Sequence, residues 1–286
     1  MLMDMYKNIP LIVISLIMVN LMPGVVNATN TDNHSSDQGS KHVESHDTKH
    51  KQVDTVSGQH HEIHWGYTGA GGPHVWGELL DEYSTCKTGK FQSPVDISSV
   101  TIGPMPNIRL NYKSSTIRVI NNGHTIKIEY DAGSTIQVST KTYQLLQFHF
   151  HSPSEHTIGG KAYPMVAHLV HQSADGHLGV LGVLFIEGRE NAFLNQFWNS
   201  LPQNQGDKFV DRKTKINMKN LLPRKLQYFN YIGSLTTPPC SEGVNWMVLA
   251  HPVEASRQQI DKFLALFPQS VRPVEPLNGR VVILKN

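Results

Sequence analysis

The strongest constraint on the fold is the alternating segment Leu-Leu-Gln-Phe-His-Phe-His at residues 145–151. Successive side chains of a β-strand point to opposite faces of its sheet, so the segment divides into two sets. One face would carry Leu145, Gln147, His149 and His151. The other would carry Leu146, Phe148 and Phe150, which can join a hydrophobic core. The segment therefore predicts a strand with one apolar face and one face that presents two histidines.

From Trp65 onward, short runs rich in β-branched and aromatic residues recur along the chain. Turn sequences join several of them: Asn121-Asn122-Gly123, Asp131-Ala132-Gly133 and Asp175-Gly176. Such a pattern is typical of antiparallel sheets. Helical patterns are confined to residues 191–200 and 256–267. We therefore expect a mainly β (α+β) fold, with a large central, twisted, mostly antiparallel sheet and a few short surface helices.

The N-terminus has the pattern of a secretory signal peptide. Lys7 supplies a positive charge, residues 9–22 form an apolar run, and Val26-Asn27-Ala28 resembles a small-residue cleavage site. We expect a signal peptide at residues 1–28 that is cleaved after Ala28, and an exported protein that is periplasmic or secreted. An uncleaved membrane anchor stays open as the alternative, because the apolar stretch is near the lower length limit for a membrane span.

Residues 29–62 are polar and cannot bury enough apolar surface to offset the entropy of ordering, so we interpret them as a disordered linker before a folded domain at residues 63–286. The linker holds the histidines His34, His42, His46, His50, His60 and His61. Weak metal capture is the alternative to a solvated spacer.

The net charge of the whole chain is +2, which gives no strong electrostatic case for nucleic acid as a partner.

A second strand-like run, at residues 166–171, supplies a third candidate histidine, His168. Alternation places Val166 and Val170 on the same face as His168. Three neutral imidazoles on rigid strands suit Zn²⁺, and catalytic zinc sites use three protein ligands and leave a fourth position open. On spacing alone, a metal site and hydrogen-bonded structural histidines are equally open. We interpret the remaining histidines of this region, His156 and His171, as structural and His177 as solvent-exposed.

Several motifs resemble, in the same order, those of the α-type carbonic anhydrases of the bacterial, exported kind. In the metal region these are residues 147–151, Ser154-Glu155-His156-Thr157 and His168-Leu169-Val170-His171. The others are Trp65-Gly66-Tyr67, Gln-Ser-Pro-Val-Asp-Ile at 92–97, Asn-Asn-Gly-His at 121–124, Gly-Ser-Leu-Thr-Thr-Pro-Pro-Cys-Ser-Glu-Gly at 233–243, Arg272-Pro273 and Pro276-Leu277-Asn278. The similarity runs from residue 65 to about residue 283, and implies an α-carbonic anhydrase catalytic domain over residues 63–286.

The resemblance implies reversible hydration of carbon dioxide to bicarbonate and a proton by a zinc-bound hydroxide. The zinc ligands would be His149, His151 and His168. Zinc lowers the pKa of its bound water to about 7, a value known from carbonic anhydrase itself. Thr236 would accept a hydrogen bond from the hydroxide and donate one to Glu155, which positions the attacking oxygen. His124 would carry the proton to solvent, because histidine titrates near neutral pH.

Because carbon dioxide has no net dipole, its pocket should be apolar. By the resemblance, the substrate-binding residues are Val170, Val180, Leu235, Thr237, Val244 and Trp246. The polar side would be organised by Tyr67, Asn122 and Gln147, and Gln147 would also accept a hydrogen bond from His149. The resemblance further implies inhibition by sulfonamides and anions, a disulfide between Cys86 and Cys240, and a homodimer as one open oligomeric state. Two free thiols or a zinc site are the alternatives to the disulfide.

Two positions depart from the family's pattern. Val166 stands where the family usually has a glutamate that accepts the ring N–H of the third zinc histidine. Because valine cannot accept a hydrogen bond, we expect zinc retention to be weaker by about 10- to 100-fold. Lys127 stands where a neutral amide is more common. We expect its ammonium group to lower the pKa of His124, unless the long side chain reaches solvent instead.

Two other functions stay open at this point. One is a non-catalytic or weakly active binding module with the carbonic anhydrase fold, which Val166 favours. The other is a zinc-storage protein that uses the histidine-rich linker.

Overall fold

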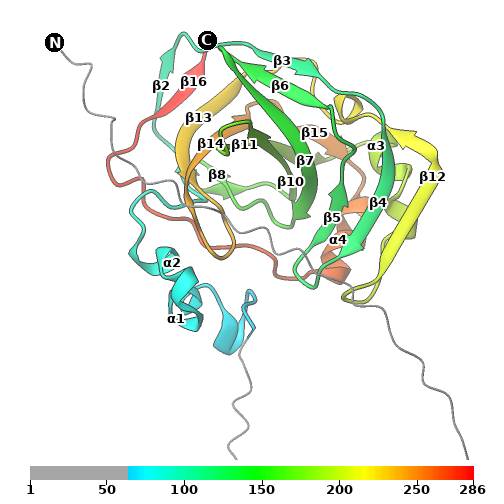
Figure 1. Cartoon of the computed structure of the whole chain (residues 1–286), viewed down its shortest axis with the longest axis horizontal. Helices are drawn as coiled ribbons and strands as arrows, with labels where there is room; N and C mark the ends of the chain where they lie inside the picture. The colour runs from blue at the N-terminus through cyan, green and yellow to red at the C-terminus, as the bar shows by residue number, and fades with distance from the viewer. Residues whose placement is uncertain (1–63) are drawn as a thin grey trace, which may run out of the picture. The chain divides into compact units, whose positions relative to one another are not determined.

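The computed structural model describes residues 64–286 (Figure 1). The expected signal peptide, its cleavage site after Ala28 and the expected histidine-rich linker lie outside the described residues, and stay predictions. Within residues 64–286, no helix combines the length and the apolar character that a membrane crossing requires.

One sheet of 13 strands dominates the domain (Figure 1). The order along its main path is β12-β4-β5-β7-β10-β11-β14-β13-β16-β2. These strands are β2 (Val100–Gly103), β4 (Ser115–Asn121), β5 (Ile126–Glu129), β7 (Lys141–His151), β10 (Met165–Ser173), β11 (Leu178–Glu187), β12 (Lys208–Ile216), β13 (Tyr228–Ser234), β14 (Glu242–Leu249) and β16 (Val282–Lys285). Off this path lie β3 (Ile108–Asn111), β6 (Thr135–Val138) and β15 (Val253–Ala255). A small second sheet contains β1 (Asp96–Ile97), β8 (Thr157–Ile158) and β9 (Lys161–Ala162).

Most neighbouring strands of the large sheet run antiparallel, as the sequence predicts. The exceptions are the parallel pairs β11 with β14, β11 with β15, and β16 with β2. The fold class is therefore confirmed as a large, mixed but mostly antiparallel sheet with few helices.

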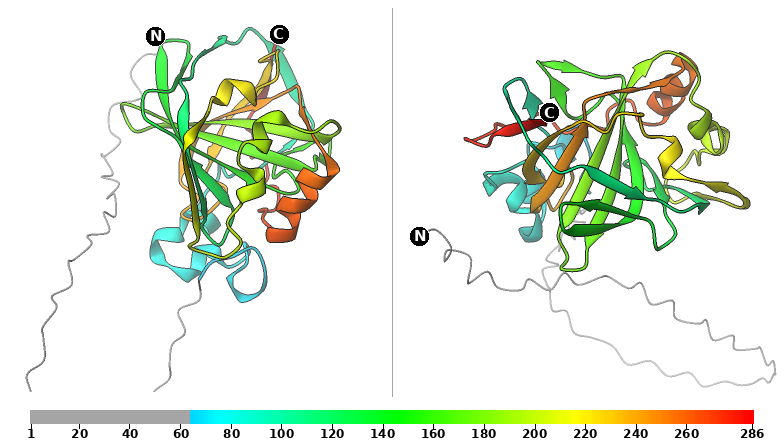
Figure 2. Two further views of the ribbon diagram at one scale, coloured as in Figure 1. Left: turned by 90° about the vertical axis from the view of Figure 1, so that its right-hand side faces the viewer. Right: turned by 90° about the horizontal axis from the view of Figure 1, so that it is seen from above.

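Both predicted helical segments are present and pack on the larger hydrophobic cluster. The first contains α3 (Ala192–Asn195) and the 3-10 turn Trp198–Ser200. The second is α4 (Arg257–Leu266). Ser256 caps its N-terminus and forms a capping box with Gln259, which satisfies free backbone N–H groups. Its Phe263 ring lies 6.0 Å from the ring of Phe150 on β7, so α4 covers the larger core (Figure 2).

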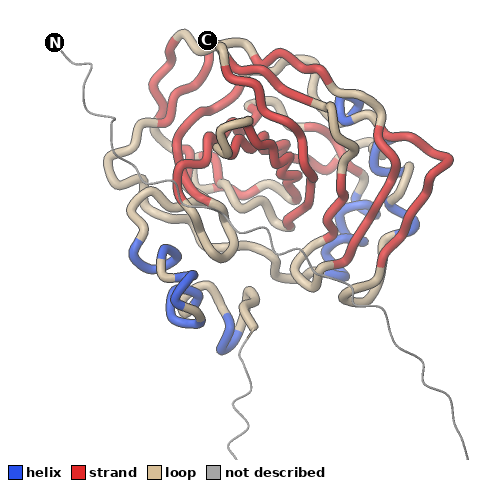
Figure 3. Tube along the Cα trace, in the orientation of Figure 1, coloured by secondary structure: helices blue, strands red, loops and turns tan. Residues whose placement is uncertain are grey.

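The sequence patterns did not predict the helical segments that precede β1. They are the 3-10 turns Gly69–Gly71 and Asp81–Tyr83 and the helices α1 (Trp76–Leu79) and α2 (Thr85–Thr88). A further 3-10 turn lies at Met218–Asn220. Each has only three or four residues, too few to produce a helical hydrophobic period. Figure 3 shows that helical segments lie around the strands rather than among them.

The predicted turns set the strand connections. Gly123, Gly133 and Gly176 have φ angles of +86°, +96° and +85°, a region that glycine adopts without the penalty of a side chain. In the turn between β4 and β5, Asn122 Oδ1 accepts the backbone N–H groups of His124 (3.0 Å) and Thr125 (2.8 Å). This Asn-Gly turn therefore fixes the backbone that presents His124.

Strand alternation sorts the apolar side chains into two clusters. On β10, Ala167 and Leu169 join the larger cluster, which also holds Phe148 and Phe150. Val166 and Val170 join the smaller cluster, on the opposite face of the strand. The two faces of β10 are therefore both buried, which explains its nearly continuous apolar sequence.

The alternation predicted for residues 145–151 of β7 is wrong at Leu145 and Leu146. Leu145 is fully buried in the larger cluster, whereas Leu146 is 38% exposed. The cause is a β-bulge: Val170 pairs with Gln147 but His171 pairs with Leu145, so Leu146 has no partner on β10. The bulge reverses the alternation before Gln147, and leaves the assignment of Gln147, Phe148, His149, Phe150 and His151 intact.

Cys86 and Cys240 form the predicted disulfide. It links α2 to the loop that follows Thr236, across a sequence separation of 154 residues. The cross-link therefore joins the helical N-terminal part of the domain to the loop between β13 and β14.

Removing this cross-link should destabilise the domain. The chain-entropy model gives about 5 kcal/mol for so long a loop, and loss of a native disulfide typically costs about 2–5 kcal/mol. We expect the free energy of unfolding of the Cys86→Ala/Cys240→Ala variant, measured by urea titration, to fall by that amount. A loss below about 0.5 kcal/mol, the size of an ordinary surface substitution such as Lys113→Ala, would contradict this expectation.

Candidate metal centre and active site

The pairing of β7 with β10 brings three histidines together. His149 lies directly opposite His168 in the antiparallel register, and His151 lies one pair along the same strand face, opposite Val166. One ring nitrogen from each histidine lies within 4.8 Å of the others. Among residues 64–286, this is the group of histidine, cysteine and acidic side chains that could hold a metal ion.

Hydrogen bonds orient two of the three rings. His149 Nδ1 lies 2.9 Å from Gln147 Oε1, and His151 Nδ1 lies 2.5 Å from the backbone carbonyl of Ser270. Both oxygens only accept, so each Nδ1 carries a proton, and Nε2 is the nitrogen of each ring that could bind a metal. The Nε2 of His151 is buried and has no hydrogen-bond partner in the described part of the chain. A ring that is oriented by a hydrogen bond at one nitrogen and has a buried, unpartnered second nitrogen is typical of a metal-binding histidine.

The third ring differs in its support. His168 Nδ1 lies 3.7 Å from Glu155 Oε2, the same oxygen that lies 3.5 Å from His151 Nε2. Its Nε2 is buried without a hydrogen-bond partner among the described residues. Val166, two residues earlier on the same strand face, is fully buried and offers no acceptor. The ring of His168 is therefore held by packing, for example against Trp246 at a centroid distance of 4.9 Å.

The protonation states of the rings suit zinc. Burial, followed by the neighbouring His151, holds the pKa of His149 and of His168 well below the ordinary value. Both rings are therefore neutral at neutral pH, the form that binds metal. Three imidazoles on two rigid strands, two of them held neutral in this way, fit Zn²⁺.

Glu155 lies beside the histidine group without belonging to it. Its Oε2 is 3.5 Å from His151 Nε2, and its Oε1 accepts the backbone N–H of Arg272 at 3.0 Å. Burial raises the pKa of Glu155, while His151, the Arg272 N–H and the Thr236 hydroxyl lower it. Thr236 is itself only 5% exposed. The structure thus brings the predicted threonine and glutamate together next to the three histidines.

The predicted apolar residues also gather. Val170 pairs with Gln147 on one side and with Val180 on the other, and Val180 pairs with Trp246. These side chains belong to the smaller hydrophobic cluster together with Val244, and Leu235 packs against it. Thr237, next to Thr236, is half-buried, and its carbonyl accepts the backbone N–H of Cys240 at 2.9 Å.

The predicted polar side lies at the turn between β4 and β5. His124 stacks on Trp65 with a centroid distance of 3.6 Å and an interplanar angle of 9°. A cavity of about 460 Å³ beside this stack is lined by His64, Trp65, Tyr67 and His124, among others. The Tyr67 hydroxyl is buried without a hydrogen-bond partner in residues 64–286, and burial raises its pKa well above the ordinary value.

The effect expected of Lys127 on His124 is wrong. The pKa of His124 is indeed lowered, but the causes are burial and then His64. Lys127 pairs across the sheet with His149 and lies 3.5 Å from Glu129. Its charge therefore disfavours protonation of His149 instead.

Some residues that support the site are not marked by the sequence pattern. Ser270 supplies the carbonyl for His151, and Trp65 supplies the stacking partner of His124. His156, interpreted as structural, is fully buried, and its Nε2 lies 2.6 Å from the Tyr231 hydroxyl. Trp65 belongs to a motif that the resemblance includes, whereas nothing in the local sequence around Ser270 marks a carbonyl that accepts a hydrogen bond.

The Nε2 of His168, which has no hydrogen-bond partner among residues 64–286, should gain one from an acidic side chain at position 166. In Val166→Glu, a carboxylate two residues away on the same strand face would accept the Nε2–H and hold the ring for the metal. We expect zinc loss to a chelator to slow by about 10- to 100-fold, as followed with a colorimetric zinc indicator. Val166→Gln, which also offers an acceptor but adds no charge, is the matched control for electrostatic attraction. Equal rates in the parent and in both variants would contradict the prediction.

Comparison with known proteins agrees with this geometry. Residues 71–286 match the family model described as eukaryotic-type carbonic anhydrase. The carbonic anhydrase of Neisseria gonorrhoeae is 46% identical over 226 residues, which cover 77% of this chain and 87% of that protein. A hyperthermostable carbonic anhydrase from an active hydrothermal vent chimney is 49% identical, with a TM-score of 0.75 over 78% of this chain and 100% of its own.

The α-carbonic anhydrase from Thermovibrio ammonificans, solved with the inhibitor sulfanilamide, is 47% identical. Its TM-score is 0.74, over 77% of this chain and 98% of its own. Family model, relatives and solved structures therefore agree with the residues at the site: the chain belongs to the α-carbonic anhydrase family.

Proposed function

We propose that the chain catalyses the reversible hydration of carbon dioxide to bicarbonate and a proton, with zinc held by His149, His151 and His168. The observation that carries this proposal is the convergence of three imidazoles from two paired strands, with Glu155 beside them but outside their group. When bound, zinc supplies a nucleophile at neutral pH by lowering the pKa of water to about 7. The roles of the other residues follow from their positions around this group.

Thr236 and Glu155 would orient the attacking oxygen. An ionised Glu155 can only accept, so the Thr236 hydroxyl donates its hydrogen bond to Glu155, and the Thr236 oxygen is left to accept a hydrogen bond from the reacting group. The Arg272 N–H and the Thr236 hydroxyl both favour the ionised form of Glu155. The pair would contribute by positioning the reacting atoms.

The apolar wall would receive carbon dioxide. Val170, Val180 and Trp246 are at most 9% exposed, and they lie on the same face of the sheet as His168. Carbon dioxide is linear and has no dipole, so it loses little hydration free energy when it leaves water. A water molecule against such a wall would lose hydrogen bonds. This wall therefore separates the substrate from the polar side on which His124 lies.

His124 would carry the proton away. It lies on an exposed turn of the β4–β5 hairpin, stacked on Trp65, and burial lowers its pKa from the ordinary value of 6.5. The neutral form therefore predominates at neutral pH, and can take up a proton from the site and release it to buffer.

Stopped-flow hydration of carbon dioxide, with the zinc content measured on the same sample, tests the proposal. We expect turnover with one zinc per chain, its loss after zinc removal or in His149→Ala, and inhibition by sulfanilamide. Absence of turnover with zinc fully loaded would favour a non-catalytic binding module. Several zinc ions per chain without turnover would favour zinc storage in residues 29–62.

Loss of the imidazole of His124 should affect proton export alone. In His124→Ala, we expect kcat to fall by at least about tenfold, while kcat/KM for carbon dioxide stays within about twofold of the parent. Added imidazole buffer should restore kcat. His177→Ala removes an exposed histidine far along the chain and serves as the matched control. Equal losses of kcat and kcat/KM would contradict the assigned role.

Export and assembly are also part of the proposal. The sequence of residues 1–28 supports export to the periplasm or the medium, and N-terminal sequencing of the mature protein should start at Thr29. A disulfide is compatible with an oxidising compartment. Light scattering on the purified enzyme distinguishes a homodimer from a monomer.

A further inference from the structure

A short stretch between α4 and β16 contacts two groups of the site at once. The carbonyl of Ser270 accepts the Nδ1–H of His151, and the backbone N–H of Arg272 donates to Glu155 Oε1 at 3.0 Å. The backbone conformation of residues 270–272 therefore sets both the orientation of a zinc ligand and the position of the Glu155 carboxylate.

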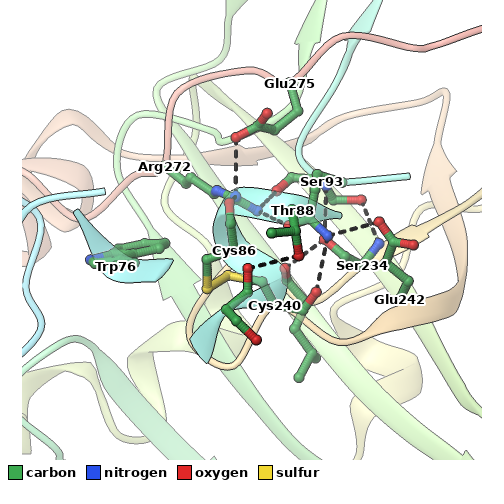
Figure 4. The surroundings of a disulfide bond; sticks show 12 residues. Trp76, Cys86, Thr88, Ser93, Ser234, Cys240, Glu242, Arg272 and Glu275 are labelled. Atoms are coloured by element: carbon green, nitrogen blue, oxygen red, sulfur yellow. Dashed lines mark hydrogen bonds and ion pairs between the residues drawn. A yellow bond between two sulfur atoms is a disulfide. The ribbon is translucent and has the colours of Figure 1, made fainter. Parts of the chain in front are cut away.

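The side chain of Arg272 anchors this stretch. Arg272 is 3% exposed, and its Nη1 donates to Gln92 Oε1 at 2.8 Å and to the Ser93 carbonyl at 2.9 Å. Its Nη2 donates to the Cys86 carbonyl at 3.1 Å and lies 3.1 Å from Glu275 Oε1. Figure 4 shows Arg272 between Glu275 and Ser93, beside the disulfide of Cys86 and Cys240. The two terminal nitrogens make four contacts in several fixed directions, which a lysine ammonium group cannot reproduce.

The same network reaches the loop that contains Thr236. Gln92 Nε2 donates to the carbonyl of Cys240 at 3.1 Å, and the Cys240 N–H donates to the Thr237 carbonyl at 2.9 Å. Arg272 thus contacts the Cys86 side of the disulfide directly and the Cys240 side through Gln92. The guanidinium group also lies over the ring of Trp76, 5.7 Å from its centroid (Figure 4).

We propose that Arg272 is a positioning residue of the reaction: its buried guanidinium group fixes residues 270–272 against the disulfide-linked segments, and so fixes His151 and Glu155. This inference rests on the proposed function for its kinetic consequence, but the contacts that it invokes are independent of turnover. An arginine that only adds stability would loosen the domain as a whole when replaced. A positioning arginine should displace His151 and leave His149, which Gln147 orients, unchanged.

Nuclear magnetic resonance of the full-length, zinc-loaded protein separates these two cases. The Nδ1–H groups of His149 and His151 donate to different acceptors, a side chain and a backbone carbonyl, and give separate ring N–H signals. In Arg272→Lys, we expect the His151 signal to shift or to exchange faster with water. The His149 signal should stay where it is in the parent.

Steady-state kinetics of the same proteins provide a second test. We expect kcat/KM for carbon dioxide to fall by about 10- to 100-fold in Arg272→Lys, the usual effect of losing a partner that orients a ligand. Arg280→Lys is the matched control, because Arg280 is a partly buried arginine of the same C-terminal segment that binds the carbonyls of Leu277 and Ile232. Its kcat/KM and both ring signals should match those of the parent.

Two results would overturn the inference. One is an unchanged His151 signal with kcat/KM within twofold of the parent, and the other is an equal shift of both ring signals. If Arg272→Lys does not fold, Glu275→Gln decides, because it releases only the ion pair: a smaller shift confined to His151 supports the inference, and no shift contradicts it. An inactive parent enzyme would refute the proposed function, while the ring signals would still decide where Arg272 acts.

Discussion

The register between β7 and β10 is the constraint on which the site depends. It places His149 directly opposite His168, with His151 opposite Val166 on the same face. Because side chains alternate with a period of two, a slip of one residue would turn His168 into the larger core and abolish the group. Because both faces of β10 are buried, such a slip would also exchange the apolar side chains of the two clusters, which differ in shape and composition.

The same sheet separates the two halves of the chemistry. One row across the strands runs from the polar β5 to the apolar β14 and contains Glu129, Gln147, Val170, Val180 and Trp246. The neighbouring row contains Lys127, His149 and His168. Charged and amide groups thus lie on the side where the His124 turn begins, and apolar groups lie on the other. A neutral substrate and a departing proton can therefore use different walls of one site.

Local pattern predicted the parts of the site that local chain geometry determines. Alternation over a few residues located His149, His151 and His168, and the Asn-Gly turn located the backbone of His124. The β-bulge at Leu146 was not predictable, because it depends on the partner strand. Arg272 joins Cys86, Gln92 and Glu155, which lie more than 100 residues away, so no window of sequence contains its role. The expectation for Lys127 failed for a related reason: its cross-strand neighbour is His149, which register alone determines.

The most direct test of this account is the anomalous diffraction of zinc-loaded crystals at the zinc absorption edge. The account predicts one strong peak between His149 Nε2, His151 Nε2 and His168 Nδ1, with Glu155 beyond bonding distance of about 2.0–2.2 Å. Glu155 Oε2 lies 3.5 Å from His151 Nε2, so the carboxylate is near enough for the experiment to be decisive. A peak in which Glu155 completes the coordination, or a peak away from these three rings, would contradict the account.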